Sequence, residues 1–155
     1  MPVFLPYLSG ERTPHMNPHA TGMFVGLKHQ TDRAQMTRAV LEGVAFACAD
    51  SQRVIEQAGT SVSSISVVGG GARSLYWGRI IATVLNRPLQ YHQDAAVGPA
   101  FGAARLALMA SSGGEIKTVA FAPPVEAVVE PELAWASELQ DRLVRYRSTY
   151  QRVFS

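Results

Sequence analysis

The sequence predicts an α/β fold in which a small, incomplete sheet packs against helices. Short β-branched or aromatic runs alternate along the chain with longer stretches whose apolar residues recur at helical spacing, and such alternation is typical of α/β proteins. Only three or four short strands are recognisable among the 155 residues, whereas sheets usually have about four to six. We therefore expect residues 1–155 to form a single unit that is part of a domain.

The N-terminal residues 1–22 are expected to form an extended lead-in loop. They contain four prolines, which exclude a long helix: Pro2, Pro6, Pro14 and Pro18. The run Phe4–Leu8 is apolar enough to lie against the core. His15 and His19 are four residues apart, but the intervening proline disfavours the helical geometry that would pair them, so we predict no metal site. A short strand is expected over Met23–Leu27.

A long helix is predicted from a cap at Thr31 or Asp32 to about Ala58. Gln35 would complete a capping box with Asp32, and Gly59 suits the position after a helix end. Apolar and small residues define a main face and extend onto the opposite side: Met36, Val40, Val44, Ala47, Ser51, Ile55 and Ala58 on the first, and Ala39, Gly43 and Phe46 on the second. Glu42 is a candidate buried carboxylate, for which a hydrogen-bonded structural role is favoured over catalysis.

The most informative stretch is Ser64–Asn86, which joins a strand, a glycine-rich turn and a helix. A strand is expected over Ser66–Val68, and Ser74 is placed to cap the helix that follows. The turn between them is Gly69-Gly70-Gly71-Ala72-Arg73. Glycines permit left-handed backbone angles and close approach of a ligand, and backbone N–H groups at a helix N-terminus suit a phosphate.

Three interpretations of this turn remain open on the pattern alone. The turn could bind phosphate, or it could simply connect two elements tightly. It is not a P-loop, because GxxxxGK[ST] is absent. A dinucleotide-binding, Rossmann-like turn is a further alternative: Gly69 and Gly71 supply GxG and Asp94 supplies a later acid, but Ser74 stands where the third glycine belongs.

The C-terminal third contains a strand and two further helices. Leu89–Tyr91 is predicted to be a strand, and a helix should begin near Pro99 and reach about Ala110, with Gly113-Gly114 ending this unit. Gly98 and Gly102 favour close packing there. A terminal helix is expected within residues 131–155, with Leu139, Leu143 and Tyr146 among the residues on its apolar face. Its arginines are predicted to lie on a solvated face: Arg142, Arg145, Arg147 and Arg152.

Composition excludes several classes of function. Lys and Arg number 14 against 12 Asp and Glu, which indicates no nucleic-acid partner. No run of 18 apolar residues exists, so no membrane association is expected. The single cysteine, Cys48, lies in an apolar helical pattern and is predicted to be a core residue. One cysteine forms no internal disulfide, which points to a reducing, cytoplasmic location.

Three motifs together resemble the FGGY family of carbohydrate kinases over nearly the whole chain. Gly22-x-Phe24-x-Gly26-Leu27, seven residues, and then Gln35-Met36-x-x-Ala39-Val40-Leu41-Glu42 match the family's second signature at every specified position. The stretch GGGARS followed by Trp77 resembles the family's nucleotide-binding stretch, and the segment from Asp94 to Ala104 resembles the helix that comes next. Thr83 departs from the family, in which aspartate is frequent at this position.

The resemblance implies a fold and a site. Members of the family have two ribonuclease-H-like domains of the actin/hexokinase-type ATPase fold, and this chain resembles the C-terminal part of the C-terminal, nucleotide-binding domain. ATP with Mg²⁺ would be the cofactor, and a pentulose, D-xylulose phosphorylated to D-xylulose 5-phosphate, the substrate of the intact enzyme. The implied nucleotide-binding residues are Gly70, Gly71, Ala72, Arg73 and Ser74.

The resemblance also implies that this chain holds no catalytic residue. The family's catalytic aspartate belongs to the N-terminal domain and has no counterpart here, so the chain alone is expected to be inactive. A fragment that lacks strands exposes a sheet edge and an apolar face, which favours a homodimer. A stand-alone dimerising or Rossmann-like module without kinase activity is the alternative.

Overall fold

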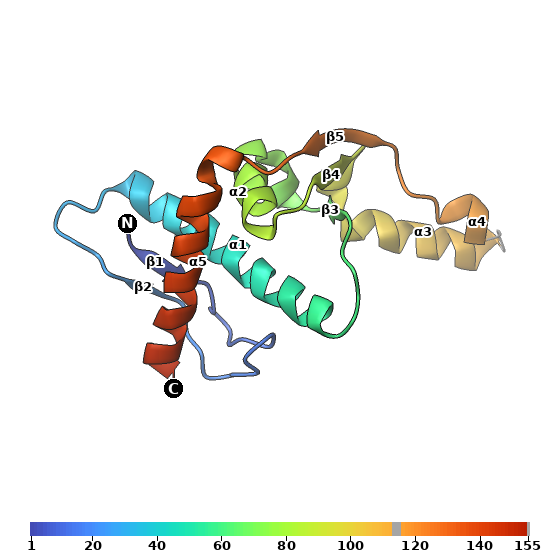
Figure 1. Ribbon diagram of the computed structural model, residues 1–155. Coiled ribbons are helices and arrows are strands. Elements are labelled where there is room, and N and C mark those ends of the chain that lie inside the picture. The colour runs from blue at the N-terminus through green and yellow to red at the C-terminus, as the bar shows by residue number, and fades with distance from the viewer. Residues whose placement is uncertain (113–115, 155) are drawn as a thin grey trace.

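The computed structural model describes residues 1–112 and 116–154 and confirms the mixed α/β class (Figure 1). Five strands and five α-helices follow one another with two 3₁₀ turns, η1 and η2, in the order β1 Val3–Leu5, β2 Met23–Val25, α1 Arg33–Gln57, β3 Ile65–Val67, η1 Gly70–Arg73, α2 Leu75–Leu85, β4 Leu89–His92, η2 Ala95–Val97, α3 Pro99–Ser112, α4 Ile116–Val119, β5 Val125–Val129 and α5 Leu133–Phe154. The predicted end at Gly113-Gly114 lies outside the described residues. None of the helices in the described part of the chain combines the length and apolar character needed to cross a bilayer.

The strands form two small sheets. β1 and β2 pair antiparallel, with Val3 opposite Val25. In the second sheet β4 lies in the centre, parallel to β3 and antiparallel to β5. Both sheets are thus as small as the sequence indicated, although β5 of the second sheet was not among the predicted strands.

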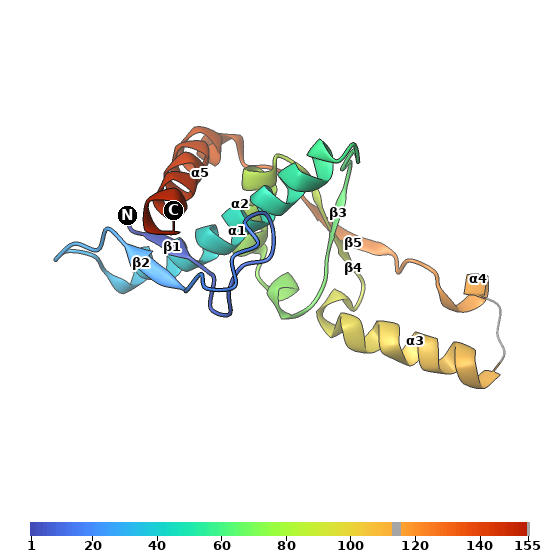
Figure 2. The same cartoon turned by 90° about the horizontal axis from the view of Figure 1, so that it is seen from below.

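The core lies where β1, α1, α2 and α5 meet, as Figures 1 and 2 show. The N-terminal segment contributes more than a lead-in loop, because β1 is buried at both ends and Tyr7 is only 5% exposed. Its apolar run therefore packs against the core, as expected. α3 and α4 extend away from this body in both views.

α1 begins and ends where the sequence predicted. Asp32 is the N-cap and forms a complete capping box with Gln35, and Gly59 follows the C-cap with φ 92°. Its deepest burial lies on the side of Ala39, Gly43 and Phe46. The predicted main face is only partly covered, so Ile55 stays 47% exposed.

That partly covered face borders an apolar groove of about 580 Å³, which we call the α1 groove. β3, α2 and the segment before β3 complete its walls; its residues include Val44, Ala47, Ile55, Ile65, Val67 and Ile81. The prediction that Cys48 is a core residue is wrong, because its side chain is exposed at this groove. The helical period correctly identified an apolar face but could not show that the described residues leave it open.

Candidate functional site

The glycine-rich turn lies between the carboxyl end of β3 and the N-terminus of α2. Residues 70–73 form the 3₁₀ turn η1, in which the Ala72 N–H donates to the Gly69 carbonyl (3.0 Å) and the Ser74 N–H to the Gly71 carbonyl (3.1 Å). Ser74 caps α2, as predicted, because its Oγ accepts from the Trp77 N–H at 3.3 Å. The five predicted site residues, 70–74, are therefore brought together in one turn.

The three glycines of this turn have different physical reasons for being glycine. Gly69 has φ 88°, a left-handed conformation that L side chains rarely adopt. Gly70 is exposed, and a Cβ there would meet no atom of the described residues within 4 Å. A Cβ on Gly71 would lie 2.6 Å from Cζ3 of Trp77. Among these three glycines only Gly69 has the unusual backbone angle, whereas the space beside both Gly69 and Gly70 is free of described atoms and could admit a ligand.

A second loop packs against the turn from the carboxyl end of the neighbouring strand. The Gly69 N–H donates to the Ala95 carbonyl at 2.7 Å. Gly98 has φ 49°, and a Cβ there would come within 3.2 Å of the Gly69 nitrogen. The close packing predicted at Gly98 is therefore present, but the same prediction for Gly102 is wrong, because a Cβ there would meet no atom of the described residues within 4 Å. Ligands of open α/β sheets commonly bind beyond the carboxyl ends of parallel strands, and the β3 and β4 loops meet at such a place.

Two hollows with mixed polar and apolar linings lie at this pair of loops. One, of about 190 Å³, is lined in part by Ala72, Arg73, Asp94 and Glu126. The other, of about 260 Å³, has His92, Asp94 and Gly98 among its lining residues. The first hollow includes two residues of the turn, Ala72 and Arg73, and so offers a ligand both cationic and anionic side chains, whereas the second is reached through the facing loop at Gly98. Glu126 comes from the unpredicted strand β5, and only its pairing with β4 brings it here.

The described residues do not gather three or more His, Cys, Asp or Glu side chains into a metal-binding cluster. His15 stacks on Tyr150, with ring centroids 3.6 Å apart and planes at 11°.

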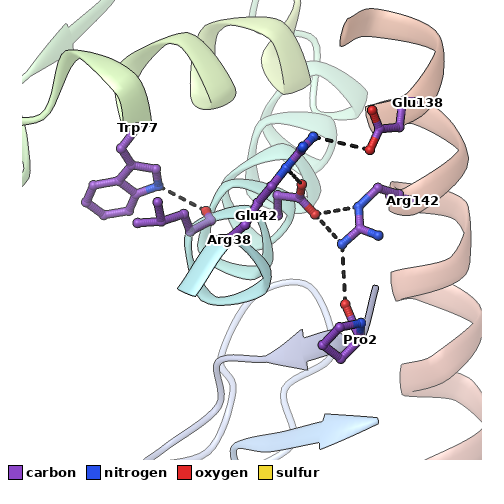
Figure 3. Close-up of polar contacts among 7 residues, drawn as sticks. Pro2, Arg38, Glu42, Trp77, Glu138 and Arg142 are labelled. Carbon is purple, nitrogen blue, oxygen red and sulfur yellow. Dashed lines mark hydrogen bonds and ion pairs between the residues drawn. The ribbon is translucent and has the colours of Figure 1, made fainter. Parts of the chain in front are cut away.

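Glu42 occupies a buried charged cluster between α1 and α5, as Figure 3 shows. Its side chain is 1% exposed; Oε1 accepts from Nε of Arg38 at 2.8 Å, and Oε2 accepts from Arg142. Arg38 also reaches Glu138 at 3.2 Å, and Arg142 donates to the Pro2 carbonyl at 3.3 Å. The structural role predicted for Glu42 is confirmed.

The predicted solvated face of arginines is wrong for two of its members. Arg142 pairs with Glu42, and Arg147 donates to Oδ1 of buried Asp50 at 2.7 Å. Both carboxylates lie on α1, about a hundred residues earlier in the chain. Helical spacing places charges around an axis but does not show which distant helix faces them, so the sequence could not reveal these pairs.

Two buried tyrosines join the segment just after β1 to α5. The hydroxyl oxygens of Tyr7 and Tyr146 lie 2.5 Å apart. Burial is the main cause that raises the pKa of Tyr7 to about 12. The hydrogen bond with Tyr146 lowers this pKa, whereas the negative charges of Asp50 and Glu11 raise it further. Burial also raises the pKa of Tyr146, and its hydrogen bond to Tyr7 acts in the same direction. Neither hydroxyl lines the glycine turn, so we treat this pair as structural.

Comparison with known proteins places this geometry in a family. The sequence profile of the FGGY family of carbohydrate kinases, C-terminal domain, matches residues 1–111. The chain is 43% identical over 152 residues to the xylulose kinase of Escherichia coli (strain K12), covering 97% of this chain and 31% of that protein. It is 50% identical over 107 residues to the xylulose kinase of Klebsiella pneumoniae, covering 69% of this chain and 22% of that protein.

Solved structures agree. The crystal structure of a xyloylose kinase from Brucella ovis superposes with a TM-score of 0.85 and 45% identity, over 98% of this chain and 31% of that one. The xylulose kinase of Rhodospirillum rubrum gives a TM-score of 0.77 and 30% identity, over 98% of this chain and 30% of that one. The chain thus aligns with only 22% to 31% of the length of these relatives. It belongs to the FGGY family of carbohydrate kinases, whose members have the actin/hexokinase-type ATPase fold.

Proposed function

We propose that this chain is the C-terminal, nucleotide-binding part of an ATP-dependent sugar kinase. The nucleotide phosphates and ribose would lie against Gly70, Gly71 and Ala72, with Arg73 and Ser74 towards the adenosine. The observation that carries the proposal is the open space at Gly70, in a turn at the carboxyl end of β3 and the N-terminus of α2. Phosphates bind such positions through backbone N–H groups and the helix dipole. Mg²⁺ would arrive with the nucleotide.

The intact enzyme would transfer the γ-phosphoryl group of ATP to D-xylulose, giving D-xylulose 5-phosphate. Support comes from the relatives: proteins named as xylulose kinases align with most of the length of this chain. ATP-dependent sugar phosphorylation also fits the cytoplasm, where we expect the protein to act.

The chain by itself should not catalyse the reaction. Phosphoryl transfer needs both substrates positioned and the transferred charge neutralised, and the family resemblance puts the sugar-activating aspartate in a part of the relatives that this chain does not span. A coupled assay with MgATP and D-xylulose should therefore give no ADP formation above a no-enzyme control. Sugar-dependent ADP formation by the purified chain would contradict this.

Nucleotide binding can be tested without turnover. MgADP titrated calorimetrically into the chain should bind saturably, and Gly70→Val should weaken binding at least about tenfold by filling the ligand's space. The control Ala134→Val, at an exposed position of α5, should bind as the wild type does, and neither variant should lower the melting temperature by more than about 2 °C. Equal binding by Gly70→Val would disprove the proposed site. NAD binding in place of ADP would instead support the Rossmann-like alternative.

We further propose that the chain forms a homodimer through the α1 groove and the adjoining edge of β3. β3 pairs only with β4 among the described strands. Its other edge therefore offers unpaired backbone groups next to an apolar surface, the combination that promotes association.

A further inference from the structure

Trp77 connects the glycine turn to the long helix α1. Its indole Nε1–H donates to the Leu41 carbonyl of α1 at 2.9 Å, and Figure 3 shows the ring directed at α1 beside Glu42. The six-membered part of the same ring lies against Gly71, where an added Cβ would be 2.6 Å from Cζ3 and 3.3 Å from Cε3. One side chain therefore contacts both the turn and the helix behind it.

The α1 end of this connection is firmly held. Leu41 precedes Glu42, whose carboxylate is fixed by arginines from α1 and α5. An indole N–H that is half-buried needs an acceptor, and the Leu41 carbonyl supplies one at a distance typical of a good hydrogen bond. The ring has little freedom to turn away from Gly71 without losing that bond.

We propose that Trp77 is a positioning residue that fixes the η1 turn and thereby sets its affinity for nucleotide. The inference rests on the proposed function of the turn. It explains why position 71 is glycine although its backbone angles do not require one: the ring occupies the space of a side chain. Trp135, the chain's other tryptophan, has different surroundings. It is half-buried on α5 and packs edge-on to Tyr76.

The test compares Trp77→Phe with the matched control Trp135→Phe in two measurements on the full chain. Calorimetry with MgADP should show about a tenfold weaker Kd for Trp77→Phe and less than a twofold change for Trp135→Phe. Amide exchange should accelerate at Ala72 and Ser74 in Trp77→Phe, while the amide of Ala82 in the interior of α2 keeps its wild-type rate. The local acceleration distinguishes positioning from a general loss of stability.

A second variant isolates the hydrogen bond from the shape of the ring. In the Trp135→Phe background, replacing residue 77 by 3-benzothienylalanine keeps the bicyclic ring but removes its N–H donor. Acceleration at Ala72 and Ser74 in this variant is expected, because the ring then lacks its anchor on the Leu41 carbonyl.

The outcomes separate this inference from the proposed function. If wild type and Trp77→Phe bind MgADP equally, positioning is wrong. If the wild type binds no MgADP, the proposed function of the isolated chain fails, and amide exchange in Trp77→Phe alone decides on positioning. Faster exchange confined to the turn then supports positioning. Unchanged exchange at the turn, or equal acceleration at Ala82, refutes it.

Discussion

Both carboxylate oxygens of Glu42 are held by arginines in a site closed to solvent. Removing one partner of such a buried group leaves the others unpaired, which typically costs about 3 to 5 kcal/mol. We expect Glu42→Gln to lower the free energy of unfolding by about 3 kcal/mol in urea titration. Glu138→Gln removes only a half-exposed contact to Arg38 and should cost less than about 1 kcal/mol. Equal losses in both variants would contradict this assignment.

The buried Tyr7–Tyr146 pair predicts a loss of stability in alkaline solution. The pKa of Tyr7 rises from 10.0 to about 12 on folding, so above pH 10 the unfolded chain releases a proton that the folded chain retains. The stabilising contribution is complete below pH 10 and is lost as pH rises towards 12. Urea titrations across this range should show the fall, and the double variant Tyr7→Phe, Tyr146→Phe should flatten it. Tyr76→Phe, at an exposed position, should keep the wild-type slope; a flat wild-type profile would refute the account.

At the residue scale the sequence predicted what local pattern can reveal. Glu42 stood out because a charge in an apolar half-helix needs partners. Its partner Arg142 was placed in solvent, since nothing in the sequence of α5 shows that this side faces α1. The turn at 69–73 and the Ser74 cap were predictable from glycine and cap chemistry, whereas the nucleotide-binding role of residues 70–74 stays a prediction from the family resemblance. The contact of Trp77 with Gly71 depends on side-chain packing and could not be predicted.

At the scale of elements, α1 and β1 approach so closely that only glycine fits between them. A Cβ on Gly43 would overlap the Phe4 carbonyl, and backbone atoms there cannot move aside cheaply. Gly43→Ala should therefore destabilise the protein by about 2 kcal/mol. The new Cβ in Gly102→Ala, in α3, would meet no atom of the described residues within 4 Å, so this variant should be neutral or stabilising by up to about 1 kcal/mol. Thermal melting of the two variants checks the contrast, and a neutral Gly43→Ala would refute it.

Element boundaries were predicted best where side chains cap or break the backbone. The capping box at Asp32 and the Ser74 cap located the starts of α1 and α2. β5 escaped prediction because four of its five residues are exposed, so it shows no alternation of apolar and polar residues. Pairing with β4, rather than its own pattern, makes it a strand.

At the scale of the whole molecule, the α1 groove determines the proposed association. Ile55→Lys would place a charge in the groove wall, and size-exclusion chromatography with light scattering should then report a monomer where the wild type is a dimer. Leu133→Lys, at a position 82% exposed and outside the groove, should stay dimeric. A monomeric wild type, or a dimer unaffected by Ile55→Lys, would contradict association through this surface.

The central claim, that residues 70–74 bind nucleotide, is tested most directly by mapping MgADP onto the amide resonances of the ¹⁵N-labelled chain. The account predicts saturable shifts concentrated at Gly69–Ser74 and at the facing loop Asp94–Gly98, with the amides around Tyr7 and Tyr146 unchanged. Shifts confined to the α1 groove, or none at saturating MgADP, would contradict it.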